Sequence, residues 1–243
     1  MPRMRLDKLL AHLNCGSRKE VQAMIRAGRV QVNGEVERDP GAKVDSDSAQ
    51  VELDGQPQRY QAQRYYMLNK PAGVITASRD ARHATVLDLF PAEMQRGLFA
   101  VGRLDKDTEG LLIVTDDGAL SHALMSPSRH VWKVYEAVVE GTLLPEAEFL
   151  FETGLRLKDG MVCLPACLER LTGNDKQRVR VTLREGKYHQ VKRMIAAVGG
   201  VVVQLRRVQL GGLRLDPALS EGAFRALTEQ ELELLRQPSR ECI

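Results

Sequence analysis

The chain has 243 residues, of which 43% are hydrophobic and 28% are charged, the composition of an ordinary globular protein with one large or two modest domains. Its formal net charge is only +3, which excludes a uniformly basic nucleic-acid-binding protein, so any basic surface has to be local. The longest apolar run, residues 194–203, is about half of a bilayer span, and the first residues do not resemble a signal peptide. We therefore expect a cytoplasmic protein without a membrane partner.

Two amphipathic helices are the first predicted elements. Leucines at helical spacing predict a helix over residues 6–13. Ser17 and Glu20 form a capping box that opens a second helix, and Gly28 ends it. The cations of this second helix share one face, away from its apolar side.

Short alternating strands around residues 30–32 and 51–53 follow, and the dipeptide Asn33-Gly34 predicts a tight hairpin turn. Residues 1–43 carry nine Lys or Arg against five acids, so this end of the chain is a basic patch. Such charges are often only solvated, but contacts to nucleic-acid phosphates also need clustered cations on a rigid element. The candidate RNA contacts are Arg5, Lys8, Arg18, Lys19, Arg26 and Arg29.

A polar stretch separates this unit from the rest of the chain. Residues 57–64 contain a proline and show no apolar period, which predicts a linker after a first domain of residues 1–56. We assign residues 65–237 to a larger second domain and residues 238–243 to a C-terminal tail. The second domain is expected to open with a strand that ends at Asn69-Lys70-Pro71, where Lys70 is either functional or merely solvent-facing.

The segment 102–110 concentrates charge between glycines, and the apolar run behind it predicts a buried strand. Three interpretations fit such a loop: a solvated turn, a carboxylate pair acting as acid and base, and one catalytic Asp kept ionised by a cation. Calcium binding does not fit, because a strand follows instead of a helix and Asp116 replaces the glutamate required at the twelfth place.

The remainder alternates between strands and helices. The predicted elements are strands over residues 132–141, 178–183 and 201–205, a helix over residues 119–125, a helix that buries Val191, Met194, Ile195 and Val198, and a final helix capped by Thr228 and Glu231. The four cysteines are interpreted as free thiols, because Cys163 and Cys167 lack the further ligands that zinc requires.

Several words of the sequence resemble the motifs of pseudouridine synthases, in particular the RsuA family that modifies ribosomal RNA. Gly102-Arg103-Leu104-Asp105 and Thr108-Glu109-Gly110-Leu111-Leu112 are similar to its active-site motif, Asn69-Lys70-Pro71 to its first motif, and residues 187–194 to its third. The N-terminal unit resembles the S4 RNA-binding domain. The resemblance implies an α+β protein, with a small S4-type α/β domain and a larger catalytic domain whose mixed, mostly antiparallel sheet is flanked by helices.

The resemblance also implies roles for single residues. Asp105 is then the catalytic residue, acting either as nucleophile on C1′ or as base at the ribose, and Tyr135 stacks on the target uracil. Lys192 pairs with Asp105, and His189 is interpreted as positioning or structural. The remaining implied residues are Arg103, Asn69 and Lys70 as support of the active site, and Lys187 and Arg193 as RNA contacts. An isomerisation exchanges neither electrons nor phosphate, so no cofactor and no metal are expected.

The implied substrate is 16S ribosomal RNA of the small subunit, with uridine 516 in the numbering of the family as the target. The RNA is expected either free or within a partly assembled small-subunit particle, and the protein is expected to act as a monomer. Two alternatives stay open: a synthase for 23S ribosomal RNA of the large subunit, and a non-catalytic assembly factor that binds RNA through its S4 unit.

Overall fold

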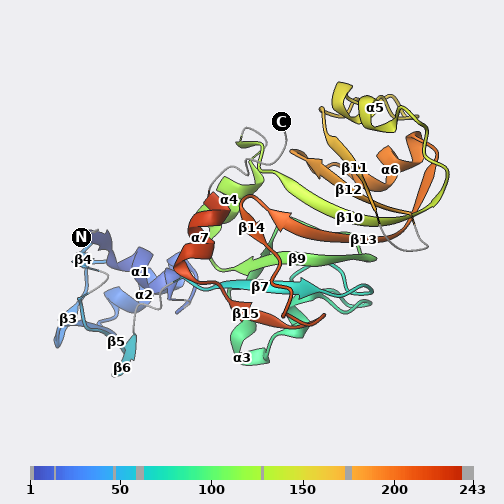
Figure 1. Cartoon of the computed structure of the whole chain (residues 1–243). Helices are drawn as coiled ribbons and strands as arrows, with labels where there is room; N and C mark the ends of the chain where they lie inside the picture. The colour runs from blue at the N-terminus through green and yellow to red at the C-terminus, as the bar shows by residue number, and fades with distance from the viewer. Residues whose placement is uncertain are drawn as a thin grey trace. The chain divides into compact units, whose positions relative to one another are not determined.

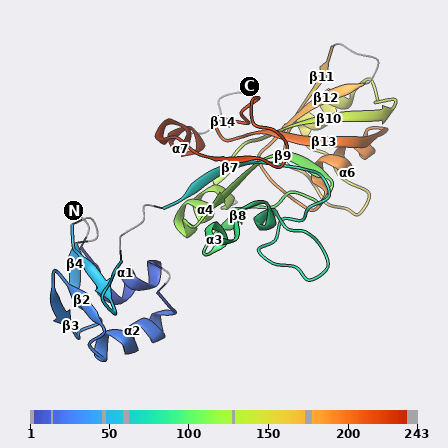
Figure 2. The ribbon, with the colours of Figure 1, turned by 90° about the horizontal axis from the view of Figure 1, so that it is seen from below.

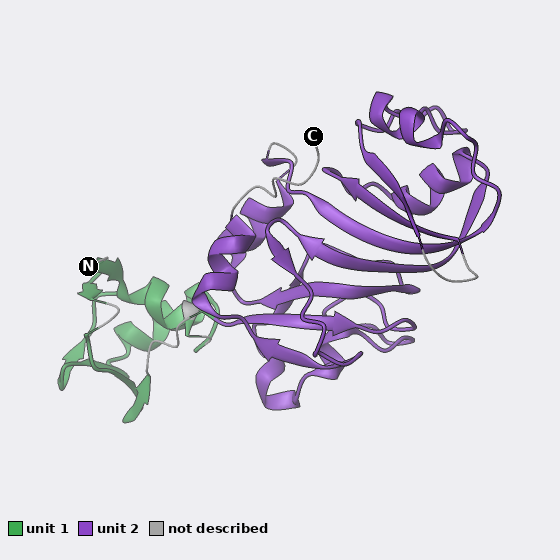
Figure 3. Ribbon diagram, viewed as in Figure 1, with its two compact units in different colours: residues 1–63 green, residues 64–243 purple. Residues whose placement is uncertain are grey.

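The computed structural model describes residues 3–13, 15–45, 48–58, 63–126, 129–172 and 177–236. These residues belong to two compact units, residues 1–63 and residues 64–243, which are coloured separately in Figure 3. No helix formed by the described residues has the length and apolar character that crossing a membrane requires. The predicted tail, residues 238–243, lies outside the described residues.

Unit 1 packs two helices against short strands (Figure 1). The helices are α1 (Leu6–His12) and α2 (Arg18–Arg26). The strands are β1 (Arg3–Arg5) paired with β4 (Lys43–Asp45), and a sheet of β3 (Glu35–Glu37), β2 (Val30–Val32), β5 (Val51–Leu53) and β6 (Gln56–Gln58) in that order. Apolar side chains of both helices, such as Leu9 and Ile25, form one buried cluster with Val30 and Val51.

The local signals of unit 1 are confirmed by its geometry. The Ser17 hydroxyl accepts from the Glu20 amide at 3.3 Å, and the Glu20 carboxylate accepts from the Ser17 amide at 2.7 Å, which completes the capping box. Asn33 and Gly34 both have positive φ, as a two-residue hairpin turn requires. The predicted linker is wrong at its start, because Gln56–Gln58 forms β6 and pairs with β5.

Unit 2 is built on a mixed sheet, and the described part of the chain contributes nine strands to it (Figure 1, Figure 2). The main path runs β11 (Cys167–Leu171), β12 (Arg178–Leu183), β10 (Lys133–Gly141), β13 (Gly200–Leu210), β9 (Thr108–Thr115), β7 (Tyr65–Lys70) and β15 (Phe224–Ala226). Strand β14 (Leu213–Arg214) pairs with β13, and β8 (Phe99–Val101) pairs with β9. Every pairing is antiparallel except that of β9 with β13, which is parallel.

An apolar cluster covers each face of this sheet. The central strand β9 contributes to both clusters, because its successive residues point to opposite sides. Leu112 and Val114 belong to the larger apolar cluster, while Leu111 and Ile113 belong to a second one. The larger cluster includes side chains from α5 (Ala147–Thr153), α6 (Gln190–Ala197) and the 3-10 helix η1 (Val86–Leu89). The second includes side chains from α4 (Gly118–Met125) and α7 (Glu229–Arg236), and the short helix α3 (Ala92–Gln95) buries none.

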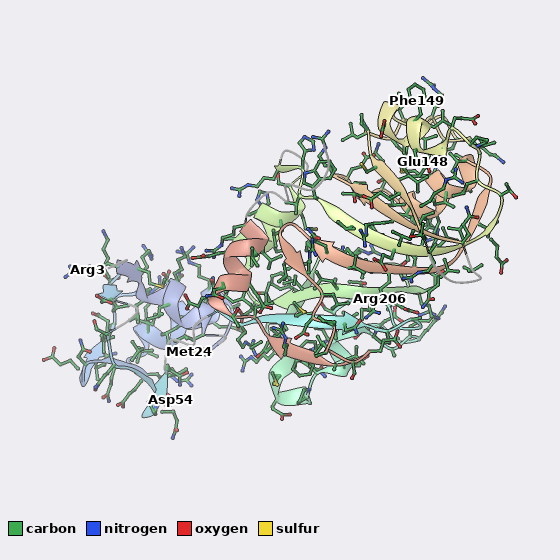
Figure 4. All side chains as sticks on the ribbon, viewed as in Figure 1. Arg3, Met24, Asp54, Glu148, Phe149 and Arg206 are labelled. Atoms are coloured by element: carbon green, nitrogen blue, oxygen red, sulfur yellow. The ribbon has the colours of Figure 1, made fainter. Side chains whose placement is uncertain are left out.

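Two strand boundaries differ from the predicted ones. Strand β9 starts at Thr108, inside the charged segment 102–110, instead of at Gly110. Strand β13 continues to Leu210 and so contains Arg206 and Arg207, which were expected to follow it; Figure 4 labels Arg206 on this strand. Polar residues inside a central strand hide its length, because a buried strand is recognised by its apolar run. Strands β8, β11 and β15 also had no predicted counterpart.

Gly110 of β9 lies against the backbone of β13 at Arg207. Its φ is +100°, and a Cβ atom added there would lie 2.3 Å from the backbone oxygen of Arg207. We expect Gly110→Ala to lower the free energy of unfolding by about 2–4 kcal/mol, through backbone strain and steric overlap. Urea denaturation measures this change. Gly118→Ala is the matched control, since no atom lies within 4 Å of that added Cβ, and equal midpoints for the two variants would contradict the close approach.

Candidate active site

A buried lysine, Lys70, binds the charged loop between β8 and β9, residues 102–107. Lys70 stands at the end of β7, opposite Gly110 of β9, and its side chain is fully buried. Its ammonium donates to three main-chain oxygens, those of Pro71 at 3.0 Å, Lys106 at 3.3 Å and Thr108 at 2.8 Å. Lys70 is therefore not solvent-facing; it ties the end of β7 to the loop at Lys106 and to the start of β9 at Thr108.

Burial is the main influence on the charge of Lys70. It lowers the pKa of this lysine to about 8, against the opposing attraction of the carboxylates of Asp107, Asp105 and Glu109. The ammonium is kept because the three carbonyl oxygens and these carboxylates replace part of the water that it lost. The loop therefore depends on a lysine whose pKa is only slightly above neutral pH.

A threonine fixes the residue before Asp105. The Thr76 hydroxyl accepts from the Leu104 amide at 3.1 Å and donates to the Leu104 carbonyl at 2.8 Å. The Gly73 amide donates to the Lys106 carbonyl at 2.8 Å. Both neighbours of Asp105 in the chain are therefore held through their main-chain atoms, Leu104 by a side-chain hydroxyl and Lys106 by an amide. Sequence reasoning missed Thr76 because nothing in its surroundings marks it.

A pocket opens above this loop on the face of the sheet that carries the larger apolar cluster. Asp105 lines it from the loop, and Tyr135 lines it from β10 with only 8% of its surface exposed. The other lining residues are Arg103, Leu104, Thr108, Leu183, Gly186, Lys187, His189, Gln190, Val191 and Leu205. The structure therefore brings together the carboxylate and the aromatic ring that the sequence places 30 residues apart.

Two nitrogen groups from the α6 region face the Asp105 carboxylate. Lys192 Nζ lies 3.6 Å from one oxygen, and His189 Nε2 lies 3.7 Å from the other. Lys192 is shared between Asp105 and Asp107, because its ammonium also lies 2.5 Å from an oxygen of Asp107. The hydrogen bond from Lys192 is the main cause that lowers the pKa of the Asp107 carboxyl. Arg103 lines the pocket from an exposed position, and among the described residues no ion pair joins it to Asp105.

Asn69 supports the sheet instead of lining the pocket. Its side-chain amide donates to the Leu219 carbonyl at 2.7 Å, its main-chain amide donates to Ala223, and its carbonyl accepts from Gly222. These bonds attach the segment that leads into β15 to the end of β7. Asn69 therefore contributes to the site through the position of β7.

The predicted RNA contacts of unit 1 divide into two groups. Arg5 and Arg18 donate to the buried Asp7 at 3.0 and 3.2 Å, and hydrogen bonds, the one from Arg5 first, hold the pKa of that carboxyl far below its usual range. Arg29 pairs with Asp54. The remaining three, Lys8, Lys19 and Arg26, are exposed and have no ion pair within the part of the chain that the structure describes. Arg18 thus joins α2 to α1, Arg5 pairs within the start of α1, and both arginines stay about half exposed.

The two predicted contacts in unit 2 are also engaged. Lys187 pairs with Glu185 at 3.0 Å and donates to the Val162 carbonyl at 2.8 Å. Arg193 pairs with Asp159. Over the described ranges, no group of three or more His, Cys, Asp or Glu side chains converges on a possible metal ion.

This arrangement suits chemistry that needs one ionised carboxylate beside a flat ring. Asp107 is 72% exposed and engaged by Lys192, and Glu109 accepts from Gln204 at 3.1 Å. Neither lines the pocket, so Asp105 is the carboxylate placed to meet a ligand there. Tyr135 offers a ring on which a planar ligand can lie.

Comparison with known proteins gives a consistent result. Residues 64–197 match the family model described as RNA pseudouridylate synthase, and residues 4–49 match the S4 domain. The chain is 47% identical over 237 residues to an uncharacterised RNA pseudouridine synthase of Bacillus subtilis, covering 97% of this chain and 99% of the relative. It is 42% identical over 231 residues to ribosomal small subunit pseudouridine synthase A of Escherichia coli, covering 94% and 98%. A crystal structure of a pseudouridylate synthase aligns with a TM-score of 0.67 at 34% identity, covering 96% and 99%.

Replacing Lys70 should damage both the fold and the site. Lys70→Met leaves three carbonyl oxygens without their donor, so we expect about 2–4 kcal/mol less free energy of unfolding. We also expect a roughly 10- to 100-fold lower turnover, because the loop that carries Asp105 shifts. Urea denaturation and initial rates measure the two effects. Lys106→Met is the control, since it removes the same charge from an exposed side chain of the same loop; equal effects of the two variants would refute the role of Lys70.

The lowered pKa of Lys70, about 8, predicts opposite pH dependences for activity and stability. Above that pH the folded protein releases a proton that the unfolded chain retains up to its ordinary pKa of 10.5, so this group raises the free energy of unfolding as pH increases. The neutral amine has only two hydrogens for three carbonyl oxygens, so the loop loosens and kcat/KM falls. Rates and urea midpoints between about pH 6.5 and 9 test this; parallel losses of both would contradict it.

Proposed function

Because the chain belongs to the RNA pseudouridylate synthase family and carries an S4 domain, we propose that it converts a uridine of small-subunit ribosomal RNA into pseudouridine at Asp105. The observation that carries the proposal is the Asp105 carboxylate, 3.6 Å from the Lys192 ammonium, in a pocket that it shares with Tyr135. The relatives named for the small subunit support 16S ribosomal RNA as the substrate, since they match over nearly their full length. Uridine 516 is the target that we expect.

The reaction breaks the bond between C1′ and N1, turns the uracil, and joins C5 to C1′. N1 gains a proton and C5 loses one, so atoms and electrons balance without a redox partner. Asp105 serves either as nucleophile at C1′ or as base at the ribose, and both roles require an ionised carboxylate. Lys192 and His189 supply the positive or hydrogen-bonding groups that keep it available when a nucleotide displaces water.

The target nucleotide has to leave its stack to reach this pocket, at a cost of a few kcal/mol. Tyr135 offsets part of that cost by stacking on the everted uracil. Its ring is buried in the wall of the pocket and fixed by β10, so little side-chain freedom is lost on binding. One chain supplies every group of this pocket, and we infer that the protein acts as a monomer.

Unit 1 contributes to RNA affinity through electrostatic contacts outside the catalytic pocket. Lys8, Lys19 and Arg26 are exposed cations of α1 and α2. We assign to them contacts with RNA phosphates, which release counterions and fix the register of the RNA without reading its sequence. Arg5 and Arg18 contribute through the half of their surface that Asp7 leaves exposed.

Asp105→Asn tests the proposed function. It keeps the shape of the side chain and removes its charge, so pseudouridine formation should fall by about 10³-fold or more while RNA affinity changes little. Chemical modification and primer extension map pseudouridine on deproteinised 16S and 23S ribosomal RNA and on partly assembled small subunits. Glu109→Gln is the matched control, because it removes a charge from the same motif outside the pocket.

Three outcomes of this experiment are informative. Pseudouridine in 16S ribosomal RNA that depends on Asp105 supports the proposal. Pseudouridine in 23S ribosomal RNA alone moves the substrate to the large subunit and keeps the role of Asp105. No pseudouridine on any of these RNAs, together with tight RNA binding, would support a non-catalytic assembly factor instead.

A further inference from the structure

We propose that Tyr188 and His189 form a second base-binding site, at the edge of the catalytic pocket, which holds the nucleobase next to the everted uridine. This inference rests on the proposed function, because it requires an RNA strand that enters the pocket at Asp105. The two rings are called the Tyr188–His189 stack below. Its ligand is an RNA base, held by stacking on the outer face of the tyrosine.

The geometry of the Tyr188–His189 stack is that of two neighbouring bases. The ring centroids are 3.8 Å apart and the planes are inclined by only 17°, close to the step of about 3.4 Å between bases along a nucleic-acid strand. Tyr188 is 74% exposed, the largest exposed fraction among the large apolar side chains of the described residues. A flat ring presented to solvent in this way can extend a stack by one more base.

The stack begins at the wall of the catalytic pocket. His189 lines the pocket, and its Nε2 atom lies 3.7 Å from the Asp105 carboxylate. Tyr188 lies against one face of the His189 ring and does not line the pocket. A uridine that enters toward Asp105 therefore passes the edge of the stack, and the adjacent base is placed beside Tyr188.

The backbone holds both rings in place. His189 has φ 47° and ψ 33°, in the left-handed region that a residue with a side chain adopts only at a cost. The Arg193 amide donates to the His189 carbonyl at 3.0 Å, and its guanidinium donates to the Tyr188 carbonyl at 3.4 Å. The Gln190 side chain accepts from the Lys187 amide at 2.9 Å. These bonds fix the main chain from which both rings project, and stacking on His189 restrains the Tyr188 ring, so less entropy is lost when a base stacks on it.

A base is the ligand that such a site favours next to this pocket. Everting one nucleotide removes a stacking partner from each of its neighbours, which is part of the cost of eversion. A pair of parallel rings replaces one of these lost contacts and requires no particular base, since every base has a π-face. The Tyr188–His189 stack thus contributes to the step that brings uridine to Asp105, and not to the bond changes.

The test uses variants that separate the ring of Tyr188 from its hydroxyl and its apolar character. Tyr188→Ala and Tyr188→Leu should lower kcat/KM by roughly 5- to 150-fold, the contribution of one base–aromatic stack. Tyr188→Phe should restore it, because the ring is kept. Tritium release from 16S ribosomal RNA labelled at C5 of uridine measures the rate. Phe149→Ala is the matched control: this phenylalanine of α5 is 63% exposed and is labelled in Figure 4.

A second measurement reports on stacking alone. In a fragment of the ribosomal RNA that carries the mapped uridine, the base on its 5′ or its 3′ side is removed. For the wild-type protein, one of these two abasic substrates should lose about the same factor as Tyr188→Ala, and Tyr188→Ala should lose nothing further on it. A purely structural role of Tyr188 predicts additive losses on both abasic substrates.

Each result decides the proposal. Unchanged kcat/KM for Tyr188→Ala in an active protein, an equal loss for Tyr188→Phe, an equal loss for Phe149→Ala, or additive abasic losses would overturn the second base site and leave the proposed function standing. Absence of pseudouridine with the wild-type protein would overturn both, and it is seen before any variant is made.

Discussion

The ammonium of Lys70 is the contact on which the pocket depends. It is buried, and its three acceptors are main-chain oxygens: that of Pro71 after β7, that of Lys106 in the loop that carries Asp105, and that of Thr108 where β9 begins. Main-chain acceptors define the path of the loop whatever side chains it bears, so the position of Asp105 follows from the pairing of two strands. The same burial that makes the cation costly also removes water, and so strengthens its bonds.

Charge balance is the second constraint on the site. Lys192 is shared between Asp105 and Asp107, and His189 approaches Asp105 from the other side. Asp107 is largely exposed and holds the lysine head near the pocket without entering it. The arrangement gives Asp105 a partner on each oxygen while its surface stays 31% exposed, so a substrate can reach the carboxylate without first breaking a tight ion pair.

Sequence patterns predicted those features whose signals are local. The capping boxes at Ser17 and Thr228 and the buried side of α6 are confirmed, because each depends on residues within one or two helical turns. Asp105, Tyr135 and Lys192 were assigned through motif resemblance, and the structure brings them together.

The features that escaped prediction depend on distant parts of the chain. The burial of Lys70 was not predictable, since two of its acceptors lie 36 and 38 residues away and are main-chain atoms. The length of β13 was hidden by Arg206 and Arg207; the latter is only 2% exposed and donates to the Leu111 carbonyl.

The distance along the chain also governs when the site forms. Lys192 is separated from Asp107 by 85 residues, and strands β10, β11 and β12 lie between them in the chain. Such non-local contacts are late events in folding. A nascent chain that has emerged from the ribosome only as far as β9 therefore carries the acidic loop and Lys70 but lacks Lys192. Synthesis of the C-terminal half supplies Tyr135, His189 and Lys192, and so completes the pocket around Asp105.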